Sequence, residues 1–208
     1  MNRIPHPYIQ NKTGWCWAVC AEIVACHYTL SHPAHGFDIE VWRREYPYGI
    51  KTSDLQGIRL QYAGLLEDEI TVDAVQWAIV KSANDGNMGM AWDLGKENAL
   101  RYAVTGDMRT GKISVFTIGS QNESNKARQN ALMEYWCSGN RFRFAIGNFY
   151  IAGLDKAHSV ALRGNENKVL LYDPWSGYNY QCKPEDIFVR GISSRLGQVM
   201  ISWMQIIN

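Results

Sequence analysis

Four residues of types that together perform thiol chemistry occur far apart in the sequence: Gln10, Cys16, His158 and Asp173. Cys16 follows a turn-forming stretch that ends at Gly14 and opens an apolar segment, so we expect it at the start of a helix. The unpaired N–H groups and the positive dipole end of a helix start favour a thiolate. A thiol nucleophile, an imidazole base and an orienting carboxylate are the parts of a cysteine nucleophile site.

The spacing of His158 and Asp173 predicts that the two side chains meet across a β-hairpin. Each residue lies on one of two β-like segments, and these flank the turn-forming residues 164–167. If the strands join through a four-residue turn, Asp173 falls directly opposite His158, and their Cβ atoms lie about 4.5–5.5 Å apart. Pro174 keeps Asp173 extended, because the residue before a proline avoids the helical region. Asp173 is therefore expected to orient the imidazole.

Gln10 stands six residues before Cys16. Its side-chain amide, together with the backbone N–H of Cys16, is expected to donate to the oxyanion that forms during attack on a carbonyl. The predicted site thus consists of a nucleophile, a base, an orienting residue and an oxyanion-hole donor.

The elements that must position these residues divide the chain into a mainly helical part, about residues 1–110, and a mainly β part, about residues 111–208. Residues 1–14 are expected to form an irregular arm and 84–95 a loop. Helices are predicted from Trp15 and over 38–45, 71–82, 96–104 and 122–137, the last ended by Gly139. Strands are predicted over 112–118, 142–151, 158–163, 168–172 and 198–206.

The helix that begins near Trp15 is the element that would carry Cys16. Its apolar positions follow the three- and four-residue spacing of one helix face. These positions are Cys16, Val19, Cys20, Ile23, Val24, His27 and Tyr28. We therefore expect a central core helix, with Cys16 in its first turn.

Composition limits the classes of function. The chain has 208 residues, which favours a single domain, and 46% of them are hydrophobic. Its 21 basic and 20 acidic residues give no electrostatic reason to expect nucleic acid or an anionic membrane as a partner. The apolar runs are too short to span a bilayer, so no membrane insertion is expected.

The N-terminus has no continuous apolar region of the kind found in secretion signals. Five cysteines without a pairing framework fit a reducing compartment better than a disulfide scaffold. We expect a cytoplasmic protein, or one that is translocated by a dedicated system without a classical signal peptide.

The quoted segments together resemble the papain-like cysteine peptidases, and above all their compact bacterial branch. That branch includes the double-glycine leader peptidases of bacteriocin export and the effector proteases of plant pathogens. The resemblance is carried by Gln10, the segment Gly14-Trp15-Cys16-Trp17-Ala18, the strand of His158 and the strand end Asp173-Pro174-Trp175-Ser176-Gly177. It covers these segments and the order of a helix followed by strands, but not residues 30–110.

The resemblance implies an α+β fold of papain type, in which a helical half carries the nucleophile and packs on an antiparallel sheet. It implies Cys16 as nucleophile, His158 as base and acid, Asp173 as orienting residue and Gln10 in the oxyanion hole. It implies no metal or organic cofactor. Cys20 is a departure, because many relatives have a small residue at that position.

Each candidate residue also has a purely structural interpretation. Cysteine is among the most buried residue types, so Cys16 could be a core residue. His158 could be a core histidine with its hydrogen bonds satisfied, Asp173 could only open a turn, and Gln10 could lie at the surface. Asp155 is a second-ranked orienting residue, because it falls in the loop before the strand.

Two other groups of residues have the chemistry of metal ligands. Cys20, Cys26 and His27 lie close to Cys16, but their spacing is not that of a zinc site, and core packing is the favoured interpretation. His32 and His35 stand in a polar stretch, where two histidines are usually solvated. Most tryptophans are expected in the core, while Trp15 and Trp175 are also candidates to line the cleft.

The favoured function is a cysteine peptidase that hydrolyses a peptide or protein substrate through a thioester acyl-enzyme. A first alternative is an acyltransferase of transglutaminase type, in which an amine takes the acyl group from the same thioester. A second alternative is a catalytically inactive papain fold that binds a partner. The sequence leaves open the substrate, the cleavage preference and the oligomeric state.

Overall fold

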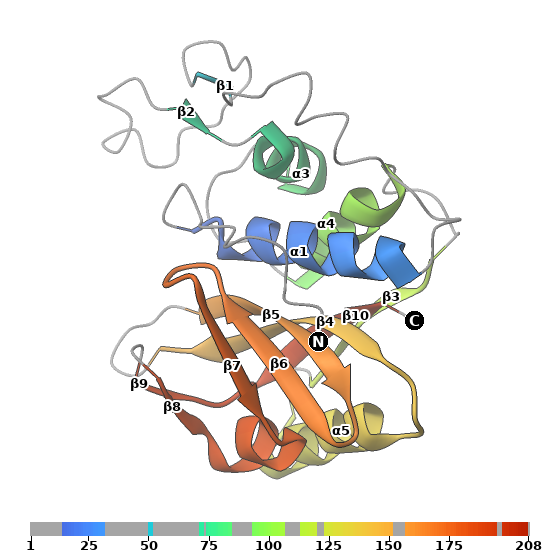
Figure 1. Ribbon diagram of the computed structural model, residues 1–208, viewed down its shortest axis with the longest axis vertical. Coiled ribbons are helices and arrows are strands. Elements are labelled where there is room, and N and C mark those ends of the chain that lie inside the picture. The colour runs from blue at the N-terminus through green and yellow to red at the C-terminus, as the bar shows by residue number, and fades with distance from the viewer. Residues whose placement is uncertain are drawn as a thin grey trace.

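The computed structural model describes residues 14–31, 50–51, 71–72, 74–84, 93–106, 113–119, 123–151, 157–194 and 197–207. In these ranges the N-terminal part is helical and the C-terminal part is an antiparallel sheet, so the expected α+β class is confirmed (Figure 1). The predictions for Gln10, Asp155, His32, His35 and the helix over 38–45 lie outside the described residues.

Helix α1 spans Cys16–Ser31 and begins where the sequence indicated. Gly14 has φ of 96°, a backbone conformation that favours glycine, and the carbonyl of Trp15 accepts the first helical hydrogen bonds, from Ala18 and Val19. The expected central core helix is confirmed, and its burial extends beyond the apolar stripe, because residues 15–25 are all buried. The reason is tertiary: α1 is enclosed by other helices on one side and by strands on the other.

The helices that cover α1 are α3, Ala74–Asn84, and α4, Asp93–Thr105. The helix expected from residue 71 begins later, because Thr71–Val72 form strand β2, which pairs with β1, Ile50–Lys51. Helix α4 begins three residues before the predicted start, inside the stretch expected to be a loop. Asp93 in its first turn suits the positive end of the helix dipole.

Six strands form the main sheet, in the order β3-β10-β4-β5-β6-β7, and every neighbouring pair is antiparallel. The strands are β3 Val115–Ile118, β4 Arg143–Tyr150, β5 Ala157–Asn165, β6 Lys168–Asp173, β7 Tyr178–Cys182 and β10 Trp203–Ile207. The central strands alternate between two hydrophobic clusters, one beside α1 and one on the opposite face. The sheet therefore has a buried layer on each side.

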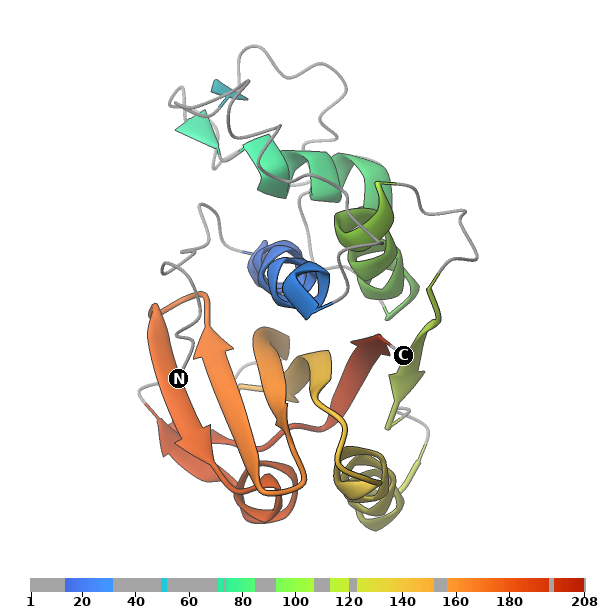
Figure 2. The ribbon, with the colours of Figure 1, turned by 45° about the vertical axis from the view of Figure 1, so that its right-hand side comes forward.

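The opposite face is covered by helix α5, Asn125–Cys137, and the short π-helix η4, Asp186–Arg190 (Figure 2). The Ser124 side chain accepts from the N–H of Ala127 at the start of α5, and Gly139, with φ of 77°, follows its end. Leu132 and Trp136 of α5 are fully buried in the second cluster. The predicted helix and its glycine stop are thus confirmed.

The single strand predicted over 198–206 is wrong. Its first residues belong to β9, Gly197–Val199, which pairs with β8, Ile192–Ser194, in a separate hairpin. Its last residues form β10. Between the two, the N–H groups of Ile201 and Ser202 donate to carbonyls of Ile187 and Asn148, so the chain leaves one sheet for another there.

Among the described residues, no helix combines the length and the apolar character that crossing a membrane requires.

Candidate active site

Cys16 is the first residue of α1 and is 6% exposed. The first N–H groups of a helix have no partner within the helix, so they point positive charge density at whatever lies before them. The helix packs against strand β5, which carries His158. Cys16 and His158 form a side-chain hydrogen bond. Two residues 142 positions apart are thus brought together, as the sequence predicted.

His158 and Asp173 are also in direct contact: His158 Nε2 lies 2.8 Å from Asp173 Oδ1. Both residues are 3% exposed. Because Nε2 is held by the carboxylate, Nδ1 is the ring nitrogen left for the sulfur of Cys16. Nucleophile, imidazole and carboxylate therefore stand in one hydrogen-bonded row.

The register that brings His158 to Asp173 differs from the prediction. Asn165 pairs with Lys168, so the turn has two residues and the strands are shifted by two positions relative to a four-residue turn. Asp173 therefore does not lie directly opposite His158. A shift of two leaves both side chains on the same face of the sheet, as diagonal neighbours within reach of one another.

The tighter turn has a local cause. The Oδ1 atom of Asn165 accepts from the N–H of Asn167 at 3.1 Å, which closes the two-residue turn. Gly164 belongs to the ladder rather than to the turn, because it pairs with Val169. An added Cβ there would lie 2.0 Å from the carbonyl oxygen of Lys168. The sequence interpretation treated both residues as turn residues.

Asp173 is held by the turn that it opens. Its Oδ1 atom accepts from the backbone N–H of Trp175 at 2.9 Å, and its Oδ2 atom accepts from the hydroxyl of Ser176 at 2.5 Å. The carbonyl of Asp173 accepts from the N–H of Gly177. The structural interpretation of Asp173 as a turn residue and the functional one as an orienting carboxylate therefore both apply.

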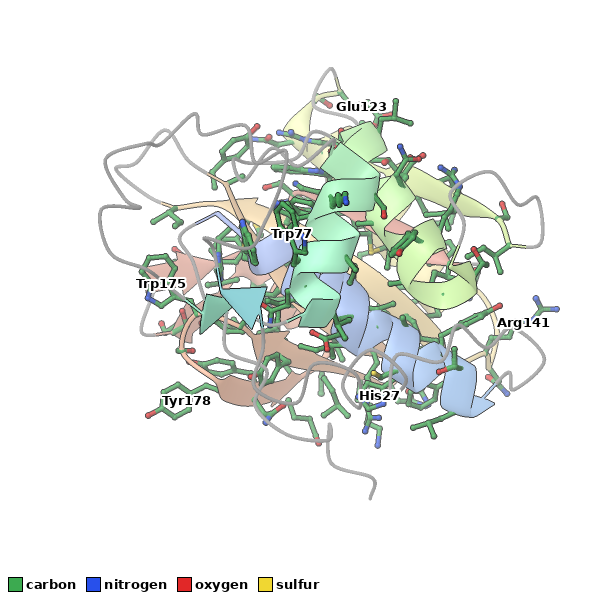
Figure 3. The ribbon with its side chains drawn as sticks, turned by 90° about the horizontal axis from the view of Figure 1, so that it is seen from above. His27, Trp77, Glu123, Arg141, Trp175 and Tyr178 are labelled. Atoms are coloured by element: carbon green, nitrogen blue, oxygen red, sulfur yellow. The ribbon has the colours of Figure 1, made fainter. Side chains whose placement is uncertain are left out.

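Two aromatic rings fix the plane of His158. Phe149, opposite His158 across β4 and β5, meets the imidazole edge to face at 5.5 Å, and Trp175 does so at 6.2 Å. Trp175 is 52% exposed, and Figure 3 shows it with Tyr178 at one margin of the molecule. Trp15, the other tryptophan expected near the cleft, is fully buried and stacks on Trp77.

The surroundings of Cys16 favour its thiolate. Burial by itself would raise the pKa of the thiol. The hydrogen bond and the charge of His158, the N–H of Ser159 and the charge of Lys96 outweigh burial, so the pKa lies below its ordinary value of 9.0.

The pKa values of His158 and Asp173 also shift so that each group favours its charged form. Burial opposes the charged form of His158, but its hydrogen bonds to Asp173 and Cys16 raise its pKa from 6.5 to about 9. Burial would also raise the pKa of Asp173, yet the bonds from His158 and Ser176 hold it below its ordinary value. A thiolate beside an imidazolium is the charge distribution that these directions describe.

Cys20, one helical turn after Cys16, has the opposite character. It is fully buried, and burial, followed by the negative charges of Cys16 and Asp173, raises its pKa well above the ordinary value. The pKa values of these two thiols on one helix are thus shifted in opposite directions by their surroundings. Within the described part of the chain, no three His, Cys, Asp or Glu side chains are grouped so that they could hold a metal ion.

Three polar residues near the site were not singled out in the sequence: Lys96, Asn148 and Ser159. The amide oxygen of Asn148 accepts from both Lys96 Nζ, at 2.9 Å, and Ser159 Oγ, at 2.8 Å. For Lys96 a signal exists, because it occupies a core position of α4 at three- and four-residue spacing from Ala99 and Leu100. Asn148 and Ser159 carry no such signal within their strands.

Comparisons of the chain with protein-family models, with curated proteins and with solved structures find no match.

Proposed function

We propose that the protein is a cysteine peptidase of papain type, which hydrolyses a peptide or protein substrate through a thioester on Cys16. The observation that supports it most is the single row of Cys16, His158 and Asp173, closed by the 2.8 Å bond between the last two. A helix start beneath the sulfur and an imidazole held by a carboxylate are what a thiol nucleophile requires.

In the first half of the proposed reaction, the Cys16 thiolate attacks the carbonyl carbon of the peptide bond. A C–S bond forms, and the electron pair of the C=O bond moves onto oxygen. When this intermediate collapses, the C–N bond breaks and His158 gives its proton to the leaving amine. The products are a free amine and a thioester on Cys16.

In the second half, the neutral imidazole of His158 takes a proton from water while the water oxygen attacks the thioester. The C–S bond breaks, the acid is released, and the thiolate and the imidazolium return. Asp173 holds the Nε2–H throughout, which keeps Nδ1 directed at the sulfur and stabilises the positive ring.

The developing oxyanion is expected beside the start of α1, where the backbone N–H of Cys16 is available as a donor. Gln10 stays the predicted second donor, and it lies outside the described residues. The exposed ring of Trp175 next to His158 offers an apolar wall against which a bound substrate excludes water.

The proposal is tested by incubating the protein with a peptide library and identifying the products by mass spectrometry, with Cys16→Ala as the control. We expect cleaved peptides with new amino and carboxyl ends from the wild-type protein and none from the variant. An added primary amine distinguishes acyl transfer, because it then appears bound to the acyl product. Absence of any product from the wild-type protein, with Cys16 unreactive, would favour a binding function.

A further inference from the structure

Lys96 is a buried cation in the core of the helical layer. It is 2% exposed and shares the apolar face of α4 with Ala99, Leu100, Ala103 and Val104. Taking an ammonium group out of water is costly unless charges and hydrogen bonds compensate it. A lysine at such a position therefore indicates negative or polar groups facing it.

The direct contacts that Lys96 makes with described residues are to neutral groups. Its Nζ donates to Asn148 Oδ1 at 2.9 Å and lies 5.1 Å from the ring centre of Trp203. Among the described residues, no carboxylate forms an ion pair with Lys96. Asp93, one turn earlier on α4, acts on it at longer range, while Asp93 Oδ1 accepts from the indole of Trp203 and the amide of Gln205.

Within the described ranges, the other negative charge that acts on Lys96 comes from helix α1, which lies beside α4 on the same face of the sheet (Figure 2). Burial lowers the pKa of Lys96, whereas the charges of Cys16, Asp93 and Cys20 raise it. Since burial holds Cys20 in its neutral form, the Cys16 thiolate is the anion that α1 presents to Lys96.

A second connection runs through hydrogen bonds. Asn148 is fully buried, and its amide oxygen joins Lys96 to the hydroxyl of Ser159. Ser159 follows His158 on β5, and its backbone N–H donates to the sulfur of Cys16. The amide nitrogen of Asn148 donates to Gln205 Oε1 at 2.8 Å, which fixes the orientation of the amide group.

We propose that Lys96 is a positioning residue of the thiol site. Its buried ammonium stabilises the Cys16 thiolate beside His158, and its bond to Asn148, whose amide oxygen also accepts from Ser159, ties α4 to the strand of His158. The inference rests on the proposed function only in taking Cys16 as a nucleophile. It gives the Cys16 thiolate of the resting site a second cation beside His158.

The test compares Lys96→Met, which keeps the length of the side chain and removes its charge, with Lys81→Met. Lys81 is an exposed cation on α3, so its substitution controls for net charge. The readout is the rate of Cys16 alkylation by iodoacetamide against pH, resolved by mass spectrometry. We expect the midpoint of thiolate formation to move up by about one pH unit in Lys96→Met and to stay in place in Lys81→Met.

An unchanged midpoint in a folded Lys96→Met protein, with an intact near-ultraviolet circular dichroism spectrum, would overturn the inference. The charged groups that also face Cys16 are His158 on β5, Asp173 on β6 through His158, and Cys20 on α1. None of them is altered by the substitution, so the shift reports on Lys96.

A second measurement leaves Lys96 in place and decides the question if Lys96→Met does not fold. Because coupling between two sites is reciprocal, the thiolate must also hold the proton on Lys96. Carbon NMR of the lysine Cε should show Lys96 losing its proton at lower pH in Cys16→Ser than in wild type. Identical titrations contradict the inference. Neither measurement needs a peptide substrate. The inference about Lys96 can therefore be confirmed in a protein that cleaves no peptide, and it can be refuted in a protein that is an active peptidase.

Discussion

At the scale of the residue, the site depends on which atoms of Asp173 and His158 are occupied. Asp173 Oδ1 serves both the imidazole and the N–H of Trp175, while Oδ2 is held by Ser176. The ring is therefore oriented by a carboxylate that is itself fixed on both oxygens. This arrangement leaves one tautomer of His158 able to face Cys16.

The substitution Asp173→Asn should therefore impair turnover far more than Ser176→Ala. An amide can donate to the imidazole, which favours the wrong tautomer, and a loss on the order of 10²- to 10⁴-fold in kcat/KM is expected. Ser176→Ala removes only a bond to Oδ2, and about a tenfold loss or less is expected. The comparison is made by steady-state cleavage of a peptide found in the library. Equal losses would assign Asp173 to the turn alone.

The rate of turnover should have a bell-shaped dependence on pH. Activity rises as Cys16 loses its proton, at a pH below the ordinary 9.0, and falls as His158 loses its proton near pH 9. The alkaline fall arises because the neutral imidazole has no proton for the leaving amine. Alkylation of Cys16 needs only the thiolate, so its rate should not fall above pH 9. If turnover and the alkylation rate both fell above pH 9, the loss of the His158 proton would not be the cause of the fall in turnover.

Residue types were enough to predict that Cys16, His158 and Asp173 are brought together. Lys96 was not identified, because periodicity treats a lysine in a helical pattern as solvated, and only the packing of α1 on α4 shows what it faces. The role of Asn148 depends on contacts across three elements. Such contacts have no spacing along the chain that a pattern can detect.

At the scale of the element, the start of α1 is the feature on which the site depends. The start of helix α1 was predicted to within one residue, because a turn with glycine precedes a long apolar run. The register of β5 and β6 was not predicted correctly, because the length of the turn depends on the bond that the Asn165 side chain accepts from the N–H of Asn167. The two-residue period of a strand preserved the contact despite that error.

Gly14→Ala and Gly139→Ala form a matched pair. Both glycines have positive φ, 96° and 77°, and both flank a helix, so alanine should cost each protein about 1–2 kcal/mol of stability. Only Gly14 leads into Cys16, so only Gly14→Ala should slow the alkylation of Cys16. Urea denaturation measures the first effect and mass spectrometry the second. A slower Cys16 in Gly139→Ala as well would show that the effect is global.

At the scale of the whole molecule, one sheet carries helices on both faces, and the site lies where the helical layer meets the strands that hold His158 and Asp173. The order of helices before strands could be predicted. The burial of residues 15–25 on every side of the helix, the π-helix η4 and the β8–β9 hairpin could not be predicted, because each depends on segments that meet only in the folded chain.

The contact between the layers should make stability depend on pH. His27 of α1 accepts from Arg163 of β5 at 3.0 Å, and burial, followed by the charge of Arg163, lowers its pKa from 6.5 to about 4. Between pH 6.5 and pH 4, His27 therefore binds a proton in the unfolded chain but stays neutral in the folded chain. The free energy of unfolding decreases as the pH falls through this range.

The loss should amount to about 2 kcal/mol between roughly pH 7 and pH 4.5. His27→Gln keeps an acceptor for Arg163 and removes the titration, so its stability should change less over that range. Urea denaturation at a series of pH values measures both proteins. A wild-type curve parallel to that of His27→Gln would exclude this histidine as the cause.

The most direct test of the account is the reactivity of Cys16 with iodoacetamide near pH 6, measured by mass spectrometry in wild type and in His158→Ala. The exposed Cys137, whose pKa is raised by partial burial and by the charge of Glu166, serves as an internal standard for a thiol that is not activated. We expect Cys16 to react on the order of 10²-fold faster than Cys137 in wild type, and to lose that advantage in His158→Ala. A Cys16 that is unreactive in wild type, or equally reactive in both proteins, would contradict the account.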